Sequence, residues 1–117
     1  MKADVALDAL HALAHPTRLA AFRALVQVGG EGLAVGELRQ ALDVPAATLT
    51  AHLHVLRGAG LVVDEREGRV IRLRASYARM NGLIAYLTEN CCAGAAPCVP
   101  TSACTPRPNP RRSSARP

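Results

Sequence analysis

The sequence has very few aromatic residues and no tryptophan. Phe22, Tyr77 and Tyr86 are the only aromatic side chains among 117 residues, although 50% of the residues are hydrophobic. A core therefore has to be assembled from Leu, Val, Ile and Ala, which favours helices packed closely together. A chain of this length fits one domain with a modest core, and dimerisation would extend that core.

Long apolar runs are also missing. Charged residues interrupt the hydrophobic stretches, so no segment predicts a membrane span, and the N-terminus lacks the basic-then-apolar pattern of a signal peptide. We therefore expect a cytoplasmic protein. In that reducing compartment the four cysteines indicate metal-binding or redox-active thiols rather than structural disulfides.

Acidic residues are absent from the end of the chain. The formal net charge is +5, but residues 93–117 hold four arginines and no acid, which leaves ten cationic against nine acidic side chains in residues 1–92. Six of the eight prolines lie in the last 24 residues. The composition predicts a folded domain over residues 1–92 and a disordered, Cys/Pro/Arg-rich tail over residues 93–117. A nucleic-acid function has to rest on where the cations lie.

Apolar periodicity predicts helices over residues 4–14, 16–28, 45–57 and 76–90, with a short third helix that ends before Asp43. The residues expected to face the core are, helix by helix, Leu7, Leu10 and Ala14; Leu19, Phe22 and Val26; Val35, Leu38 and Leu42; Leu49, Leu53 and Leu56; and Met80, Ile84, Leu87 and Cys91. After Gly60 the period changes toward two. This predicts strands at residues 61–63 and 70–74, with a turn at Glu67 and Gly68.

The fourth helix has an unusual outer face. Ala47, Thr48, Ala51 and His54 project outward with Thr50 on the flank, so this face is small, polar and almost free of acid. Such a helix can enter the major groove, because hydroxyl and imidazole groups bond to base edges or phosphates and alanines permit close approach. A series of helices followed by a basic hairpin is the element order of a winged helix-turn-helix. The predicted fold is therefore mainly α with a small β-hairpin, and the predicted partner is double-stranded DNA.

Arg66 and Arg69 flank the hairpin turn, where a wing tip could meet an adjacent groove or the DNA backbone. Asp64, Glu65 and Glu67 lie beside them and either orient the arginines or solvate the hairpin. The remaining histidines are interpreted as packing or supporting residues rather than base readers: His11, His15 and His52.

Residues 8–92 resemble the ArsR/SmtB family of metalloregulatory repressors. The segments that carry the resemblance are LHALAHPTRL at residues 10–19, similar to the family's DPTRL opening; TAHL at 50–53 through Leu56 to AGLV at 59–62, similar to its S-x-HL-x-x-L-x-x-AGLV recognition helix; and REGR at 66–69, similar to its wing turn. The resemblance implies a homodimer with the first and last helices at the interface. It also implies binding to an inverted-repeat operator until an inducer releases the protein.

Two inducer sites found in that family are missing here. The arsenic site ELCVCDL corresponds to GLAVGEL at residues 32–38, with Ala34 and Gly36 in the cysteine positions. The zinc-type Asp/His pattern of the last helix is absent, since residues 76–90 contain neither residue type.

All four cysteines lie close together, at Cys91, Cys92, Cys98 and Cys104. This is similar to a branch of arsenic-responsive repressors whose last helix ends in a Cys pair, with a third Cys six residues later. As(III) or Sb(III) takes three thiolates in a pyramid and tolerates adjacent ligands, whereas structural zinc prefers ligand pairs separated by two to four residues. We expect Cys91, Cys92 and Cys98 to form an inducer-binding loop at the start of the tail. Cys104 is interpreted as idle, with a fourth-ligand or substitute role as alternatives.

Other functions fit parts of the same pattern. A thiol-redox sensor would join Cys91 or Cys92 to Cys98 or Cys104 in a disulfide, and a Cd- or Zn-responsive repressor would use the same thiols. A small dithiol enzyme is disfavoured, because the pair follows a helix C-terminus whose dipole opposes a thiolate, and no phosphate loop or catalytic dyad accompanies it. A winged helix that binds only protein is an alternative for the fourth helix. For the cysteines, the alternative is that Cys91 packs in the core and the others are incidental.

Overall fold

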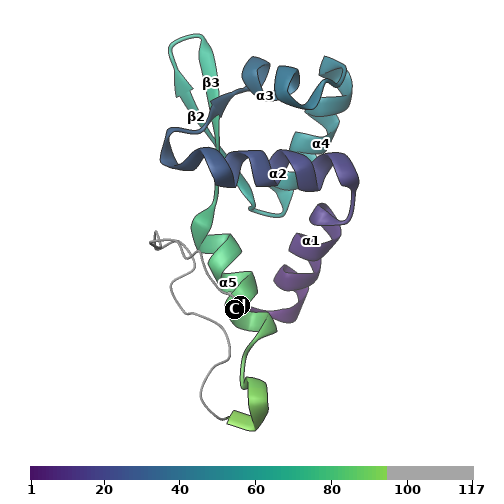
Figure 1. The fold of residues 1–117 in the computed structure, drawn as a ribbon, viewed down its shortest axis with the longest axis vertical. Helices are drawn as coiled ribbons and strands as arrows, with labels where there is room; N and C mark the ends of the chain where they lie inside the picture. The colour runs from purple at the N-terminus through teal and green to yellow at the C-terminus, as the bar shows by residue number, and fades with distance from the viewer. Residues whose placement is uncertain (95–117) are drawn as a thin grey trace, which may run out of the picture. The chain divides into compact units, whose positions relative to one another are not determined.

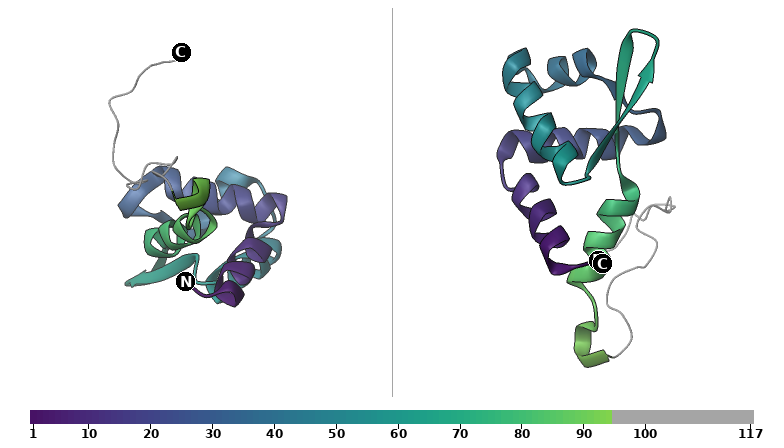
Figure 2. Two further views of the ribbon diagram at one scale, coloured as in Figure 1. Left: turned by 90° about the horizontal axis from the view of Figure 1, so that it is seen from below. Right: turned by 180° about the vertical axis from the view of Figure 1, so that it is seen from behind.

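The computed structural model describes residues 1–94, which fall into two compact units, Met1–Leu87 and a second that begins at Thr88. The first unit contains, in order, α1 (Ala3–Leu13), α2 (Pro16–Val28), the 3₁₀ helix η1 (Gly29–Glu31), β1 (Leu33–Ala34), α3 (Val35–Leu42), α4 (Ala46–Gly58), β2 (Val62–Glu67), β3 (Val70–Ala75) and α5 (Tyr77–Leu87) (Figure 1). Within this unit α3 and the hairpin lie on one side of α2, and α1 and α5 on the other (Figure 2). The predicted mainly helical fold with a small β-hairpin is confirmed.

The turn between α1 and α2 is fixed by local hydrogen bonding. His15 is the N-cap of α2, and its Nδ1 accepts the Thr17 N–H at 3.1 Å. Pro16 occupies the first helical position, where its missing N–H would have had no helical partner. The predicted second helix is therefore confirmed at both ends.

The helix-turn-helix is built from α3 and α4. Glu37 Oε1 accepts the Ala34 N–H at 2.8 Å, which satisfies a donor at the start of α3. Asp43 ends α3 in the left-handed conformation at φ 54°, and its N–H bonds to the Arg39 carbonyl at 2.8 Å. Pro45 then precedes α4 as its N-cap, so the turn between the two helices is short.

The sheet has three antiparallel strands in the order β1-β3-β2. Its hairpin runs from the Val62–Ala75 pair to the Glu67–Val70 pair, so the predicted first strand at residues 61–63 was too short. The polar half of β2 lacks apolar alternation and is stabilised by cross-strand pairing instead. The two-residue β1, in which Leu33 pairs with Leu73, was not predicted, because two residues carry no periodicity.

The core of the first unit consists almost wholly of aliphatic side chains. The largest fully buried side chains are Leu25, Leu38, Leu49, Leu53, Leu56, Leu61 and Leu73. The three leucines predicted to bury one face of α4 are among them, so that prediction is confirmed. None of the helices within residues 1–94 is long and apolar enough to cross a membrane.

The predicted inward face of α1 was wrong. Alanines form the buried face, at Ala6, Ala9 and Ala12, and they let α1 approach its neighbours closely. The predicted core residues that are instead exposed in α1 and α2 and the turn between them are Leu7, Leu10, Ala14 and Leu19.

The last helix is shorter than predicted. It spans Tyr77–Leu87 and therefore ends three residues before Asn90. Leu83 is its buried residue, while the predicted core residues Met80 and Ile84 are only half-buried. Leu87 is 58% exposed, which corrects its predicted place in the core.

Replacing Gly32 with alanine is expected to destabilise the protein by about 2–5 kcal/mol. Gly32 has φ 68°, a conformation that strains residues with a side chain, and its Cβ would press on the Leu73 carbonyl and lie 2.9 Å from Arg74 Cγ. Gly30→Ala is the matched control, because a Cβ there meets nothing within 4 Å. Urea unfolding at fixed protein concentration measures both variants, and equal loss in the two would contradict this account.

Candidate nucleic-acid interface and inducer site

The outer face of α4 has the composition expected of a groove-reading helix. Ala47, Thr48, Ala51 and His54 are exposed, and so is Thr50 on the flank. We call these five residues the recognition face. The buried leucines occupy the opposite side of the same helix, so the 3.6-residue period fixes which side chains point outward. Their exposure agrees with the sequence prediction, while their contact with DNA stays a prediction.

The polar side chains of the recognition face are not equally available. The Thr50 hydroxyl donates to the Ala46 carbonyl at 2.9 Å, so its oxygen can only accept a further hydrogen bond. Within residues 1–94 no hydrogen bond to protein engages the side chain of Thr48 or His54. Thr48 and His54 are therefore the recognition-face residues with both donor and acceptor capacity to offer a ligand.

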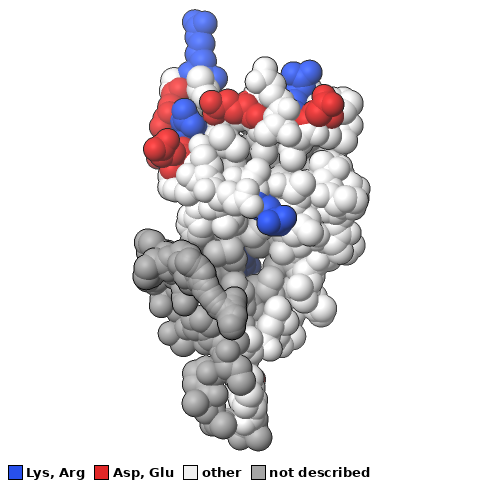
Figure 3. Space-filling view, in the orientation of Figure 1, with Lys and Arg blue, Asp and Glu red and all other residues white. Residues whose placement is uncertain are grey.

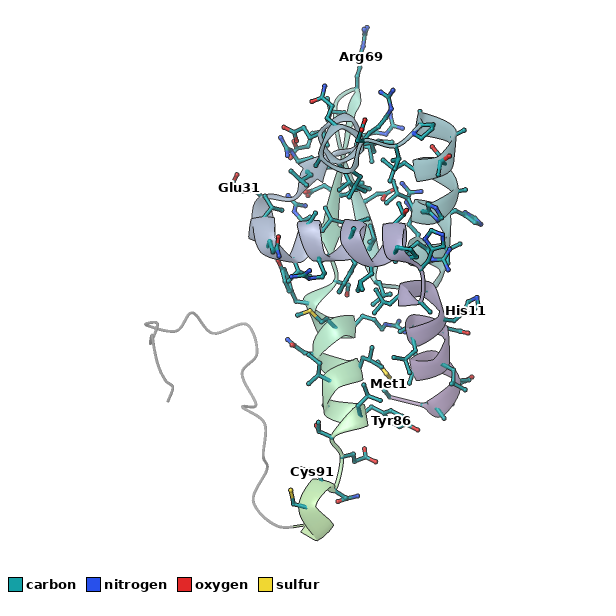
Figure 4. All side chains as sticks on the ribbon, turned by 45° about the vertical axis from the view of Figure 1, so that its right-hand side comes forward. Met1, His11, Glu31, Arg69, Tyr86 and Cys91 are labelled. Atoms are coloured by element: carbon teal, nitrogen blue, oxygen red, sulfur yellow. The ribbon has the colours of Figure 1, made fainter. Side chains whose placement is uncertain are left out.

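The hairpin of β2 and β3, which we call the wing, turns at Gly68 and Arg69. Gly68 adopts φ 63°, which permits the tight reversal. Arg69 projects from the tip, away from the rest of the first unit (Figure 4). Arg66 is exposed on β2 just before the turn. Both predicted wing contacts are thus accessible to a large polyanion.

The acidic residues of the wing are paired with other arginines. Asp64 Oδ1 accepts from Arg57 Nε at 2.8 Å, Glu67 Oε1 accepts from Arg72 Nε at 3.1 Å, and Glu65 pairs with Arg74. In the described part of the chain no carboxylate forms an ion pair with Arg66 or Arg69. The acids of the described residues therefore do not orient these two arginines, and both guanidinium groups are accessible to a partner.

Figure 3 places this pairing on the surface. Cationic and acidic side chains stand side by side over the wing and the neighbouring α3, whereas the surface over α1 and α2 in this view is mostly uncharged. On this face, charged side chains of both signs are therefore gathered over the wing and α3.

A groove separates the wing from the helix-turn-helix. Its volume is about 560 Å³. Its lining residues are Ala34, Val35, Gly36, Thr50, Leu53, Arg57, Arg69, Val70 and Ile71. The groove has no acidic residue in its lining, and it brings Thr50 of α4 and Arg69 of the wing, predicted separately, to one continuous surface.

The histidines outside the recognition face differ from one another. His11 is exposed on the outer side of α1, so its predicted packing role was wrong (Figure 4). His15 caps α2, and its ring centroid lies 4.4 Å from that of half-buried His52, which confirms a packing role for both. Burial, reinforced by the charges of His15 and Arg18, lowers the pKa of His52 below its usual 6.5.

The described cysteines lie in the second unit. Cys91 begins the 3₁₀ helix η2 (Cys91–Gly94). The prediction that Cys91 continues the apolar stripe of α5 is therefore wrong. Asn90 and Cys92 are both left-handed, at φ 58°, which breaks the helical path on either side of Cys91. The predicted ligands Cys98 and Cys104 lie outside the described residues. Among residues 1–94 no three His, Cys, Asp or Glu side chains are grouped to hold a metal ion.

Sequence comparisons agree with this architecture. A helix-turn-helix domain model matches residues 13–65. The HTH-type transcriptional repressor SmtB of Mycobacterium tuberculosis is 39% identical over 71 residues, which are 61% of this chain but 50% of that protein, so the chain matches half the length of that relative. The Biofilm growth-associated repressor of Agrobacterium fabrum is 42% identical over 84 residues, covering 72% of this chain and 69% of the relative.

Solved structures give the same result. The ArsR family transcriptional regulator RHA00566 superposes with a TM-score of 0.65 at 26% identity, covering 77% of this chain and 90% of that structure. The homodimeric winged helix-turn-helix domain of Mb0332 from Mycobacterium bovis superposes with a TM-score of 0.59 at 29% identity, covering 74% and 81%.

The fold and the exposed α4 face define a winged helix-turn-helix transcription regulator. The 42% identity to the Agrobacterium fabrum repressor, over more than two thirds of that protein, narrows this class to one family. The chain belongs to the ArsR/SmtB family of transcriptional repressors.

Proposed function

We propose that this protein represses transcription by binding an operator as a homodimer, with α4 in the major groove and the wing against the adjacent backbone. The observation that carries the proposal is the acid-free, exposed recognition face of α4, beside a wing whose tip arginines have no carboxylate partner within residues 1–94. A slim face permits groove entry, while the wing cations position the protein on phosphates.

The exposed leucines and the homodimeric structure of Mb0332 both favour a homodimer. Leu7 and Leu10 of α1 are 64% and 40% exposed, and Leu87 of α5 is 58% exposed. Burying such side chains against a second copy removes apolar surface from water, at about 25 cal/mol per Å². The interface proposed from the first and last helices therefore has apolar residues available to it on both of those helices.

Leu7→Glu is expected to weaken dimerisation about 100-fold or more. A two-fold interface contains each residue twice, and each lost leucine contact removes about 1.5 kcal/mol or more, so the two together remove about 3 kcal/mol or more. Val63→Glu is the matched control, since Val63 is similarly apolar and 48% exposed but lies on the wing. Sedimentation equilibrium measures both, and a dimer that tolerates Leu7→Glu while dissociating with Val63→Glu would place the interface elsewhere.

We further propose that As(III) or Sb(III) is the inducer, held by Cys91, Cys92 and Cys98. In this reaction each thiol proton joins a hydroxide of As(OH)₃, so three As–S bonds replace three As–O bonds and three waters leave. Cys92 is exposed and Cys91 half-buried, so the first two thiols are accessible to a thiophilic ion. In this proposal the third thiolate is that of Cys98, which follows the pair by six residues in the sequence.

Closing this chelate would constrain the chain that follows α5. Because α5 is one of the two helices proposed for the dimer interface, such a constraint can favour a dimer geometry that fits the operator less well. Effector coupling of this kind usually amounts to about 1–3 kcal/mol, or roughly 5–150-fold in DNA affinity. The released state is therefore a weaker binder and not an unfolded protein.

Fluorescence anisotropy on promoter DNA tests both proposals. The reduced protein is titrated onto labelled promoter and onto a scrambled duplex, at several salt concentrations, and the complex is then treated with As(III), Sb(III), Zn(II), Cd(II) or peroxide. We expect tighter binding to the promoter, and release by As(III) and Sb(III). Equal affinity for both duplexes contradicts the operator proposal. Release by peroxide alone favours a redox sensor, and release by Cd(II) or Zn(II) alone favours a divalent-metal sensor.

A further inference from the structure

Arg18, in the first turn of α2, reaches two other helices at once. Its Nε donates to the Ala12 carbonyl at 2.7 Å, and its Nη2 donates to the His11 carbonyl at 3.5 Å. Both carbonyls belong to the last turn of α1, where a cation is favoured by the helix dipole. Its third contact is with α4, where Nη1 lies 3.4 Å from His52 Nδ1.

The contact with His52 has only one hydrogen-bonding arrangement. A guanidinium can only donate, so His52 Nδ1 must accept and carry no proton. The His15 ring lies beside the His52 ring, with centroids 4.4 Å apart and planes tilted by 41°. His15 is itself held by the Thr17 N–H, so α2 constrains His52 from two directions.

His52 occupies a sensitive place in α4. It follows Thr48 by one helical turn, so the two side chains are neighbours on the helix surface. It also lies between Ala51 of the recognition face and Leu53 of the core. The group that holds His52 is therefore close to the side chains that would meet DNA.

We propose that Arg18 and His52 are positioning residues, which join the C-terminal end of α1 to α4 and set the orientation of the recognition face. This inference rests on the proposed operator binding and adds residues that do not themselves need to touch DNA. The joint is defined by the three Arg18 contacts, and it connects the consecutive helices α1 and α2 to α4, which is distant from them in sequence.

The joint is sensitive to protonation. A proton on His52 Nδ1 removes the acceptor and places a second cation beside Arg18, with His15 as the other titratable group in ring contact. The pKa of His52 is lowered where the joint is formed, first by burial and then by His15 and Arg18. His52 therefore binds a proton less readily when it contacts Arg18 than when that contact is lost. As a result, the contact is stable above about pH 6.5 and weakens as the pH falls below that value.

The test compares His52→Asn with His52→Leu in a His54→Gln background, which removes the one histidine of the recognition face. Asn Oδ1 can occupy the place of Nδ1 and accept from Arg18, whereas leucine cannot. Anisotropy on promoter DNA is measured near pH 7.5 and pH 5.5, on either side of the usual histidine pKa of about 6.5. We expect the leucine variant to bind about tenfold more weakly at the higher pH, and the asparagine variant to bind like the parent.

The pH profile separates positioning from simple loss of stability. The parent is expected to lose several-fold in affinity at the lower pH, and the asparagine variant to keep its affinity. A leucine variant that binds as tightly as the parent, or an asparagine variant with the parent's pH profile, overturns the proposal. If the leucine variant does not fold, the comparison of parent and asparagine variant still decides. If the protein with both His52 and His54 unchanged binds no DNA at either pH, that result instead refutes the proposed operator binding.

Discussion

Ala51→Glu is expected to abolish specific operator binding, lowering the affinity about 1000-fold, to the level of non-specific binding. Ala51 is exposed in the middle of the recognition face, between Thr48 and His54. A glutamate there adds a long side chain to a surface that must approach base edges, and it adds a negative charge facing the phosphates. Anisotropy on promoter DNA measures the loss directly.

The fold should tolerate that change. Ala51 packs against nothing in the core, and glutamate is a good helix former, so the free energy of unfolding should fall by less than about 0.5 kcal/mol. Gln27→Glu is the matched control, because it adds the same charge at an exposed site of α2 outside the recognition face. If Ala51→Glu retained the affinity of the control, α4 would not be the helix that reads DNA.

Cys98→Ser is expected to eliminate the response to arsenite while leaving operator binding intact. With two thiolates the pyramidal As(III) site is incomplete, so the 5–150-fold loss of DNA affinity that is typical of such coupling, about 1–3 kcal/mol, should disappear. The measurement is the operator dissociation constant of the reduced protein with and without arsenite.

Cys104→Ser is the matched control for that experiment, since it removes a thiol from the same tail. It should behave like the unchanged protein. A normal arsenite response in Cys98→Ser together with a lost response in Cys104→Ser would identify Cys104 as the third ligand. Loss of response in both would indicate a four-thiol site.

The sequence predicted the elements that have strong periodicity. In α4 three leucines recur at helical spacing, so both its buried side and its exposed side followed from the pattern. The inward face of α1 did not follow, because alanine and leucine compete for burial there and a single chain does not reveal where a second copy would pack. The exposure of Leu7 and Leu10 is intelligible once a partner surface is allowed.

The candidate site was predictable in composition but not in its contacts. Exposed Arg66 and Arg69 followed from their place beside the turn, whereas the pairing of the wing acids with Arg57, Arg72 and Arg74 depends on register. The Arg18–His52 joint links residues 34 positions apart, and no local pattern indicates such a contact. The end of α5 was missed for a similar reason, because the apolar spacing continues to Cys91 while the backbone turns before it.

The central claim is that three cysteine thiols control how tightly α4 holds DNA. It is tested most directly by adding arsenite to promoter complexes of the reduced protein and of a Cys91→Ser/Cys92→Ser/Cys98→Ser variant, with anisotropy as the readout. We predict that both proteins bind the promoter equally well, and that arsenite releases only the protein with its cysteines intact. Release of the triple variant by arsenite would contradict the account.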